Sequence, residues 1–134
     1  MDNQISLPAY PSGEIRTAAE DFARLMMMFQ NRGALDGARI LSEDSVNLML
    51  TPSGYRNVDG WNQSLGLNGP LDLRGGQLWG HDGQDVWDSS AFYFNPDTHV
   101  GAIAFANGNY RDYSMNYTLL DLDLHLMSWF ENSN

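Results

Sequence analysis

Residues 77–106, with the sequence QLWGHDGQDVWDSSAFYFNPDTHVGAIAFA, decide the fold of this chain. They contain three strand-like segments, which are Gln77–His81, Ser89–Phe94 and Val100–Ala106. Turn residues separate the segments, with Gly83 in the first connection and Asn95-Pro96-Asp97 in the second. Connections this short join neighbouring strands in antiparallel order. The stretch therefore predicts an antiparallel meander, which ends at Asn107-Gly108.

Helical patterns precede the meander. Thr17-Ala18-Ala19-Glu20 matches a capping box, in which Thr17 would accept from the backbone N–H of Glu20 while Glu20 reaches back. We expect a helix from there to about Gly33. Ser42 is expected to start a second helix, because Glu43 and Asp44 follow it and acids are favoured at the positive end of a helix dipole. Thr51-Pro52 ends that helix.

The terminal segment, Tyr113 to Phe130, fits two patterns. Its centre alternates like a strand from Leu120 to Leu126. Over the longer window the polar residues keep a helical period, with Met115, Leu119, Leu122, Leu126 and Trp129 opposite them, and the length favours a helix of about five turns. With a short strand expected around Trp61–Leu67, we predict an α+β fold. An antiparallel sheet of three to four strands is packed by a long C-terminal helix, and two helices lie on the N-terminal side.

Composition limits the functions that remain. The length of 134 residues fits one domain, 1–134, and the net charge of −10 disfavours nucleic acid and anionic membrane surfaces as partners. No apolar run is long enough for a membrane span. The absence of Cys excludes thiolate chemistry and Cys-based zinc sites. The three His are too scattered for a zinc triad, and Asp82, Asp85 and Asp88 match no calcium loop, so we expect no metal and no cofactor.

The segment Gly80-His81-Asp82-Gly83-Gln84, which we place in a turn at the end of a strand, is the strongest candidate for chemistry. By itself, such a His is more often structural or solvated. Its context changes that balance, because further motifs surround it in a fixed order. These are Tyr10-Pro11-Ser12-Gly13, Thr17–Asp21, Gly37–Ser45, Met49–Pro52, Leu65-Gly66-Leu67, Phe94–Asp97 and Asn107-Gly108.

This succession resembles the C-terminal part of the serine β-lactamase and penicillin-binding-protein family, which includes class C β-lactamases, D-aminopeptidases and related esterases. The resemblance runs from about Tyr10 to the last helix and implies a partial β-lactamase-like fold. It also implies an acyl-enzyme mechanism with three motifs, S-x-x-K, Y-x-N and K-T-G or H-x-G. The third motif maps onto His81-Asp82-Gly83.

The residues of this third motif suit a wall of an active site. Gly83 lets a substrate approach the backbone closely, and the N–H of Gln84 can donate to a developing oxyanion. Histidine ordinarily titrates near neutrality, so His81 can assist proton transfer. Asp82 stands where the family commonly has Thr, Ser or Gly. As a substrate-binding residue its carboxylate would repel an anionic substrate, which favours neutral or cationic esters and amides; the alternative is that Asp82 faces solvent.

The other two motifs are absent. The seven basic residues are all Arg, so no Ser can belong to S-x-x-K. Tyr55-Arg56-Asn57 and Tyr93-Phe94-Asn95 spell Y-x-N, but both follow the position that the family gives its Tyr, and we interpret them as coincidences. An acyl-enzyme needs an activated nucleophile, which this chain does not supply.

We therefore expect a C-terminal fragment or half-domain of a serine hydrolase that is inactive alone, with a missing N-terminal part. The alternative is a free-standing binding or assembly protein on the same scaffold. An exposed edge near Val100–Ala106, or the last helix, predicts a homodimer. No signal peptide is evident, so a cytoplasmic location is expected if Met1 is the true start, and a periplasmic or secreted one if a longer precursor was cut.

Overall fold

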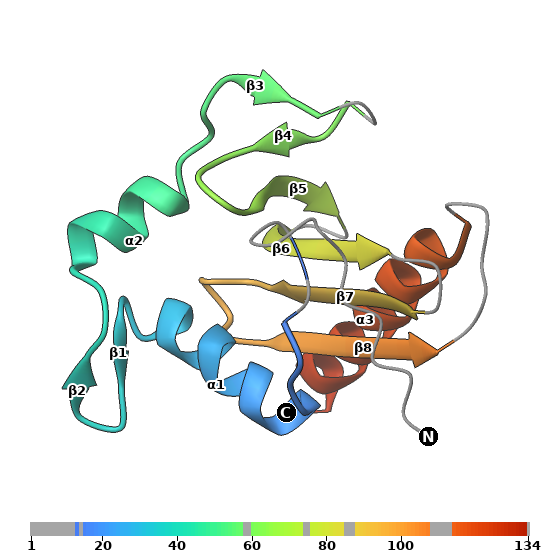
Figure 1. The fold of residues 1–134 in the computed structure, drawn as a ribbon, viewed down its shortest axis with the longest axis horizontal. Coiled ribbons are helices and arrows are strands. Elements are labelled where there is room, and N and C mark those ends of the chain that lie inside the picture. The colour runs from blue at the N-terminus through green and yellow to red at the C-terminus, as the bar shows by residue number, and fades with distance from the viewer. Residues whose placement is uncertain are drawn as a thin grey trace.

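The predicted meander forms three adjacent strands, at one end of a six-stranded antiparallel sheet, in the computed structural model (Figure 1). The structure describes residues 13, 15–57, 60–73, 76–84, 88–107 and 114–133, with the backbone alone for 73 and 114–117. Gly83 lies inside a strand, so the turn predicted at this residue is wrong. The sheet order is β3-β4-β5-β6-β7-β8. Its strands are β3 (Tyr55–Arg56), β4 (Asn62–Gln63), β5 (Asn68–Leu73), β6 (Gly76–Gln84), β7 (Asp88–Phe94) and β8 (Gly101–Asn107).

The sheet is wider than the three to four strands predicted. The expected strand at Trp61–Leu67 is wrong in its bounds, because the chain bends at Leu65 and Gly66, between β4 and β5. Gly66 has a φ of 81°. Glycine adopts this left-handed conformation without the steric cost that other residues meet, so the segment turns instead of continuing as one strand.

Helices cover both faces of the sheet (Figure 1). Helix α1 (Ala19–Gln30) lies in front of the start of β8 in the view of Figure 1, and α3 (Ser114–Asn132) lies behind β7 and β8. Helix α2 (Glu43–Met49) and the hairpin of β1 (Ala34–Leu35) and β2 (Ala38–Arg39) continue from α1. The α+β class and the C-terminal helix that packs on the sheet are confirmed.

Two hydrophobic clusters use alternate residues of the central strands. Tyr93 and Phe94 are adjacent on β7 and both are 0% exposed, which is possible because successive side chains of a strand point to opposite faces. Tyr93 belongs to the cluster under α3, with Leu78, Ala91, Ala104, Leu119, Leu120 and Met127 among its members. Phe94 belongs to the cluster under α1 and α2, with Met26, Phe29, Val46, Leu67 and Trp79 among its members.

The start of α2 agrees with the prediction from sequence, whereas the start of α1 does not. Ser42 caps α2, and its Oγ accepts from the N–H of Ser45 at 3.1 Å, as predicted. The capping box predicted for α1 is wrong, because the N-cap is Ala18 and no side chain caps this end. The hydroxyl of Thr17 instead donates to the carbonyl of Ala18 at 3.2 Å.

Helix α3 docks through a different side from the one that its apolar pattern marks. Leu119 is buried as expected, but Leu122, Leu126 and Trp129 are 46%, 38% and 61% exposed. The buried side consists of Leu119, Leu120, Asp123 and Met127. The helix therefore has apolar residues on its buried side and also on one flank, and it carries a carboxylate into the core. No helix in the described part of the chain is both long and apolar enough to span a bilayer.

Candidate functional site

The candidate segment His81–Gln84 is part of strand β6. It pairs with β7 in continuous register, His81 with Phe92, Asp82 with Ala91, Gly83 with Ser90 and Gln84 with Ser89. The preceding residue, Gly80, is required by close packing, because a Cβ there would lie 2.0 Å from the carbonyl oxygen of Phe92. At Gly83 the nearest atom to an added Cβ would be the Ser90 hydroxyl, at 2.9 Å. The pairing places these residues on a rigid strand.

At His81–Gln84, strand β6 extends beyond β5, its other neighbour in the sheet. The register of β5 on β6 begins with Asn68 opposite Gly80 and runs from there towards Gly76. Within the described residues, His81–Gln84 therefore have β7 as their strand partner and no β5 residue opposite them. A strand segment that projects beyond one neighbour can present backbone groups sideways, which is the geometry by which an edge receives an extended ligand.

The imidazole of His81 is exposed, and its Nδ1 lies 2.5 Å from the carbonyl oxygen of Asp82. A carbonyl oxygen only accepts hydrogen bonds, so Nδ1 is the donor in this contact. In the neutral ring the proton is then on Nδ1, and the lone pair of Nε2 points away as an acceptor or base. The local backbone thus selects the tautomer of His81.

Asp82 lies on the other face of the sheet from His81. Its Oδ1 accepts from Asn68 Nδ2 at 3.1 Å, and Asn68 Oδ1 in turn accepts from Gln63 Nε2 at 3.2 Å. Asn68 is only 2% exposed. Asp82 is half-buried, so the alternative in which it simply faces solvent does not hold. The Gln63–Asn68–Asp82 chain of hydrogen bonds joins β4, β5 and β6 just where β5 stops pairing.

The four predicted site residues are therefore divided by the alternation of the strand. His81 and Gly83 share the α1 side, whereas Asp82 and Gln84 share the α3 side. The backbone N–H of Gln84 lies in the plane of the sheet and is not assigned to either face. The structure brings His81 and Gly83 together and separates the Asp82 carboxylate from both.

The two Y-x-N sequences lie in different surroundings. Tyr93 is fully buried, and burial together with the nearby carboxylates of Asp82 and Asp123 raises its pKa above the ordinary value. Asn95 is buried in the β7–β8 turn, where its Oδ1 accepts from the N–H of Asp97 at 2.9 Å. Tyr55 is 63% exposed on β3. In the sequence Tyr93-Phe94-Asn95, Tyr93 therefore packs in the core and Asn95 stabilises a turn.

Asp123 is a buried group that the sequence analysis did not single out. It is 0% exposed, and neither carboxylate oxygen has a hydrogen-bond partner among the described residues. Burial raises its pKa from 3.8 to about 7. A signal was present, because Leu119, Leu120 and Met127 lie at i−4, i−3 and i+4 from Asp123, on the same face of the helix. No comparable pattern marked Asn68 or Gln63.

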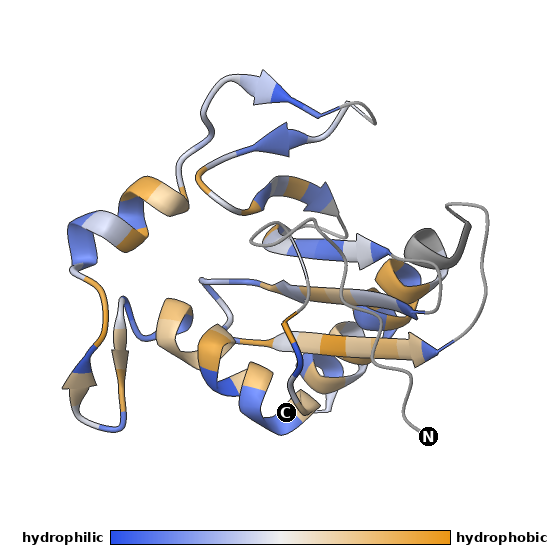
Figure 2. Cartoon of the chain, in the orientation of Figure 1, coloured by the Kyte–Doolittle hydropathy of each residue, from blue (hydrophilic) through white to orange (hydrophobic). Residues whose placement is uncertain are grey.

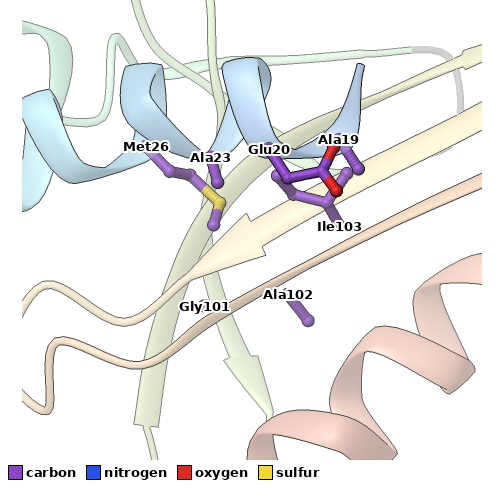
Figure 3. Close-up of a pocket in the computed structure, with 7 residues that line it drawn as sticks. All are labelled: Ala19, Glu20, Ala23, Met26, Gly101, Ala102 and Ile103. Atoms are coloured by element: carbon purple, nitrogen blue, oxygen red, sulfur yellow. The ribbon is translucent and has the colours of Figure 1, made fainter.

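Two hollows of the described structure lie away from His81. One, of about 310 Å³, is lined by α1 and β8, with Ala23, Met26, Gly101 and Ile103 around it and Glu20 as its carboxylate (Figure 3). A second, of about 360 Å³, lies beside Arg56, Trp61, Pro70, Asp72 and Leu120. Among the described residues no three His, Asp or Glu side chains gather as a metal site would require. A ligand pocket usually combines apolar walls with several convergent polar groups, which the first hollow lacks.

Comparison with known protein families identifies the family of the chain. The family model described as Beta-lactamase matches residues 2–124, which is most of the chain. The chain therefore belongs to the β-lactamase family, and the resemblance inferred from its ordered motifs is confirmed. No curated protein and no solved structure matched the chain.

Proposed function

We propose that this chain is the C-terminal part of a serine β-lactamase-like hydrolase that cleaves esters or amides through an acyl-enzyme when complete. In this proposal the chain supplies one wall of the active site and is inactive alone. Its membership of the β-lactamase family supports a serine hydrolase origin. The chain contains no Lys and therefore no S-x-x-K motif, which supports the proposal that it lacks the nucleophile.

The observation that carries the proposal is the placement of His81 on the projecting end of β6. Its Nδ1–H donates to the carbonyl of Asp82, so Nε2 is presented as a base on an exposed strand segment. Gly83 lies two residues further on the same face, where the absence of a side chain keeps the strand accessible. The N–H of Gln84 is the candidate oxyanion donor. In the complete enzyme these three would be catalytic residues beside a Ser supplied by the missing part.

Asp82 enters the proposal differently from the sequence-based expectation. Its carboxylate is engaged by Asn68 on the α3 side, so its effect on a substrate beside His81 would be electrostatic and exerted across the strand. A negative charge there still disfavours an anionic substrate, and we propose neutral or cationic esters and amides as the substrate class. Efficient hydrolysis of an anionic β-lactam by the complete protein would contradict this.

A direct experiment uses the purified chain with a chromogenic ester and, separately, a chromogenic cephalosporin. We expect neither to be hydrolysed above the rate of buffer alone. Hydrolysis that His81→Ala abolishes would overturn the proposal, because the chain would then contain a complete active site. His125→Ala, on α3, is the matched control for that comparison.

The reading frame upstream of the codon for Met1 provides a second test. An open frame that encodes S-x-x-K would support the proposal that this chain is the C-terminal part of a hydrolase. The protein that joins the upstream segment to this chain should then hydrolyse the ester. His81→Ala in the fused protein should lower kcat much more than His125→Ala does. A stop codon and ribosome-binding site directly upstream would instead support the second candidate.

That second candidate is a free-standing binding or assembly protein on the same scaffold. One observation favours it, the exposed apolar flank of α3, which contains Leu122, Leu126 and Trp129.

A further inference from the structure

A hollow lies between β4 and β5, where these two strands separate. Among the described residues, Gln63 opposite Asn68 is the one pair that joins them, and β5 pairs with β6 on its other side. Beyond that pair, residues of both strands line a hollow of about 360 Å³, and Leu120 of α3 forms a further wall. This volume is within the range of small-molecule sites, roughly 300–1,000 Å³. The hollow is near the β3 edge of the sheet, and β6 and β7 separate it from β8.

The floor of the hollow is apolar and belongs to the core under α3. Leu71 and Leu120 are 9% and 8% exposed and are members of that hydrophobic cluster, and Trp61 packs against it. Pro70 adds to the apolar lining. Side chains that are fixed in a core form a surface whose shape exists before a ligand arrives, which lowers the entropic cost of binding. The indole of Trp61 also gives an aromatic ring of a ligand a favourable packing partner.

Three polar residues line the hollow from the other face of the sheet. Leu71 faces α3, so Asp72, the next residue of β5, has its side chain on the opposite face. Trp61 also faces α3, and Asn62 follows it on β4 and points away in the same manner. Arg56 is opposite Asn62 in the β3–β4 register and therefore shares its face. Figure 2 shows β3 and β4 as hydrophilic, so the hollow is apolar at its floor and polar at its mouth.

The guanidinium of Arg56 is held at the wall of the hollow. Its Nη1 donates to the carbonyl oxygen of Gly60 at 2.7 Å, and Gly60 is itself a lining residue. The ion pairs of the described residues involve other arginines, so Arg56 has no carboxylate partner among them. A guanidinium has five N–H donors, which leaves several of them to bind a carboxylate of a ligand.

The mouth of the hollow carries two opposite charges that do not neutralise each other. Arg56 and Asp72 both line it, and they form no ion pair. The net charge of −10 repels a simple anion, whereas a ligand with one charge of each sign has no net charge to be repelled. A carboxylate is attracted to Arg56 and an ammonium group to Asp72, and the amide of Asn62 can hydrogen-bond to either. The charges therefore favour a small zwitterion.

We propose that this hollow binds a small apolar zwitterion, namely an amino acid with a large apolar side chain. The carboxylate of the ligand pairs with Arg56, and its ammonium group pairs with Asp72. The side chain enters between β4 and β5 and is buried against Trp61, Leu71 and Leu120. The lining residues lie outside β6, which contains the proposed catalytic residues, so the inference is independent of the proposed hydrolase function.

Isothermal titration calorimetry of the whole chain with phenylalanine tests the site. We expect saturable binding with a Kd of about 1 mM or lower, as the size of the ligand allows. N-Acetylphenylalanine lacks the positive charge and phenethylamine lacks the negative one. Each should bind at least about tenfold more weakly, because one charge-assisted hydrogen bond is lost. No saturable binding of phenylalanine up to about 10 mM would overturn the proposal, and so would equal affinity for N-acetylphenylalanine.

Two pairs of variants separate the local charges from the net charge. Arg56→Gln and Asp72→Asn should each weaken the binding of phenylalanine at least about tenfold. Their matched controls are Arg16→Gln and Asp97→Asn, which make the same changes of charge at exposed positions outside the hollow and should leave the affinity unchanged. If neither Arg56→Gln nor Asp72→Asn weakens binding, or if the controls weaken it equally, the proposal is wrong.

NMR spectroscopy locates the ligand on the wild-type chain. The indole N–H signal of Trp61 should shift as phenylalanine is added, and that of Trp129, which is exposed on α3, should not. A shift at Trp129 without one at Trp61 would contradict the proposal. Circular dichroism melting identifies any variant that fails to fold, and the ligand series on the wild type then decides. Hydrolysis is not measured in these experiments, so their outcome does not depend on the proposed enzymatic function.

Discussion

His81 and Asp82 are adjacent on β6 and lie on opposite faces of the sheet. The His81 imidazole donates to the backbone carbonyl of Asp82, while the Asp82 carboxylate accepts from Asn68 on the other face. The two residues are therefore linked through the main chain and not through their side chains. Any chemistry at His81 depends on the rigidity of this strand, and the buried amide of Asn68 contributes to that rigidity.

The tautomer of His81 can be observed directly. At a pH where the ring is neutral, we expect the long-range ¹H–¹⁵N NMR pattern to show a protonated Nδ1 and an unprotonated Nε2, because Nδ1 donates to a carbonyl. The signal of His125 provides the reference within the same sample. A spectrum in which His81 carries its proton on Nε2 would contradict the hydrogen bond.

Removal of the Asn68 amide should destabilise the fold. Asn68→Ala deletes a donor to Asp82 and an acceptor for Gln63 at a position that is 2% exposed. We expect the free energy of unfolding to fall by about 1–3 kcal/mol, the usual cost of depriving buried polar groups of a partner. Urea denaturation measures this, with Asn47→Ala on the exposed side of α2 as the control. A loss no larger than that of the control would show that the network does not stabilise the strands.

Two glycines of β6 should tolerate substitution very differently. In Gly80→Ala the new Cβ would lie 2.0 Å from the carbonyl oxygen of Phe92, and backbone atoms cannot move away cheaply. In Gly83→Ala the nearest atom is the Ser90 hydroxyl at 2.9 Å, which can rotate. We expect Gly80→Ala to cost about 3 kcal/mol or more and Gly83→Ala less than about 1 kcal/mol. Equal losses in thermal or urea unfolding would contradict the β6–β7 register.

Asp123 makes stability depend on pH in a direction opposite to that of most carboxylates. Its pKa is raised from 3.8 to about 7 by burial, so the folded state binds this proton more tightly than the unfolded state does. The stabilisation is complete below about pH 4, and it is lost as the pH rises towards 7. The total change is on the order of 4 kcal/mol. The nearby ionisable groups are Tyr93 and, beyond it, Asp82.

Asp123→Asn should therefore stabilise the chain relative to the wild type, and by more at about pH 8 than at about pH 5. Urea unfolding at the two pH values measures the difference. Asp121→Asn, on the exposed side of the same helix, is the control and should show little change with pH. If the effect of Asp123→Asn is the same at both pH values, the carboxyl group does not titrate between them in the folded chain.

The sequence by itself determined the local elements whose signals lie within a few residues. The Asn95-Pro96-Asp97 turn predicted the β7–β8 hairpin, and Ser42 with its two following acids predicted the start of α2. Period-two and period-3.6 patterns are local consequences of strand and helix geometry, so they can be read without tertiary contacts. The order of weak motifs also identified the family, and counting Lys excluded S-x-x-K.

The tertiary structure decided which side of each element is buried. Helix α3 has large apolar residues over more than one face, so its pattern alone did not decide between a rotation that buries Asp123 and one that buries Leu122 and Trp129; the structure has Asp123 buried and the other two exposed. The rotation of the helix depends on how its side chains fit Ala91, Tyr93 and Ala104 of the sheet. The candidate site followed the same rule. The sequence placed His81 and Asp82 together in a predicted turn, where neighbouring side chains can lie on the same side. In the structure both residues belong to β6, which pairs with β7, and successive side chains of a paired strand point to opposite faces of the sheet.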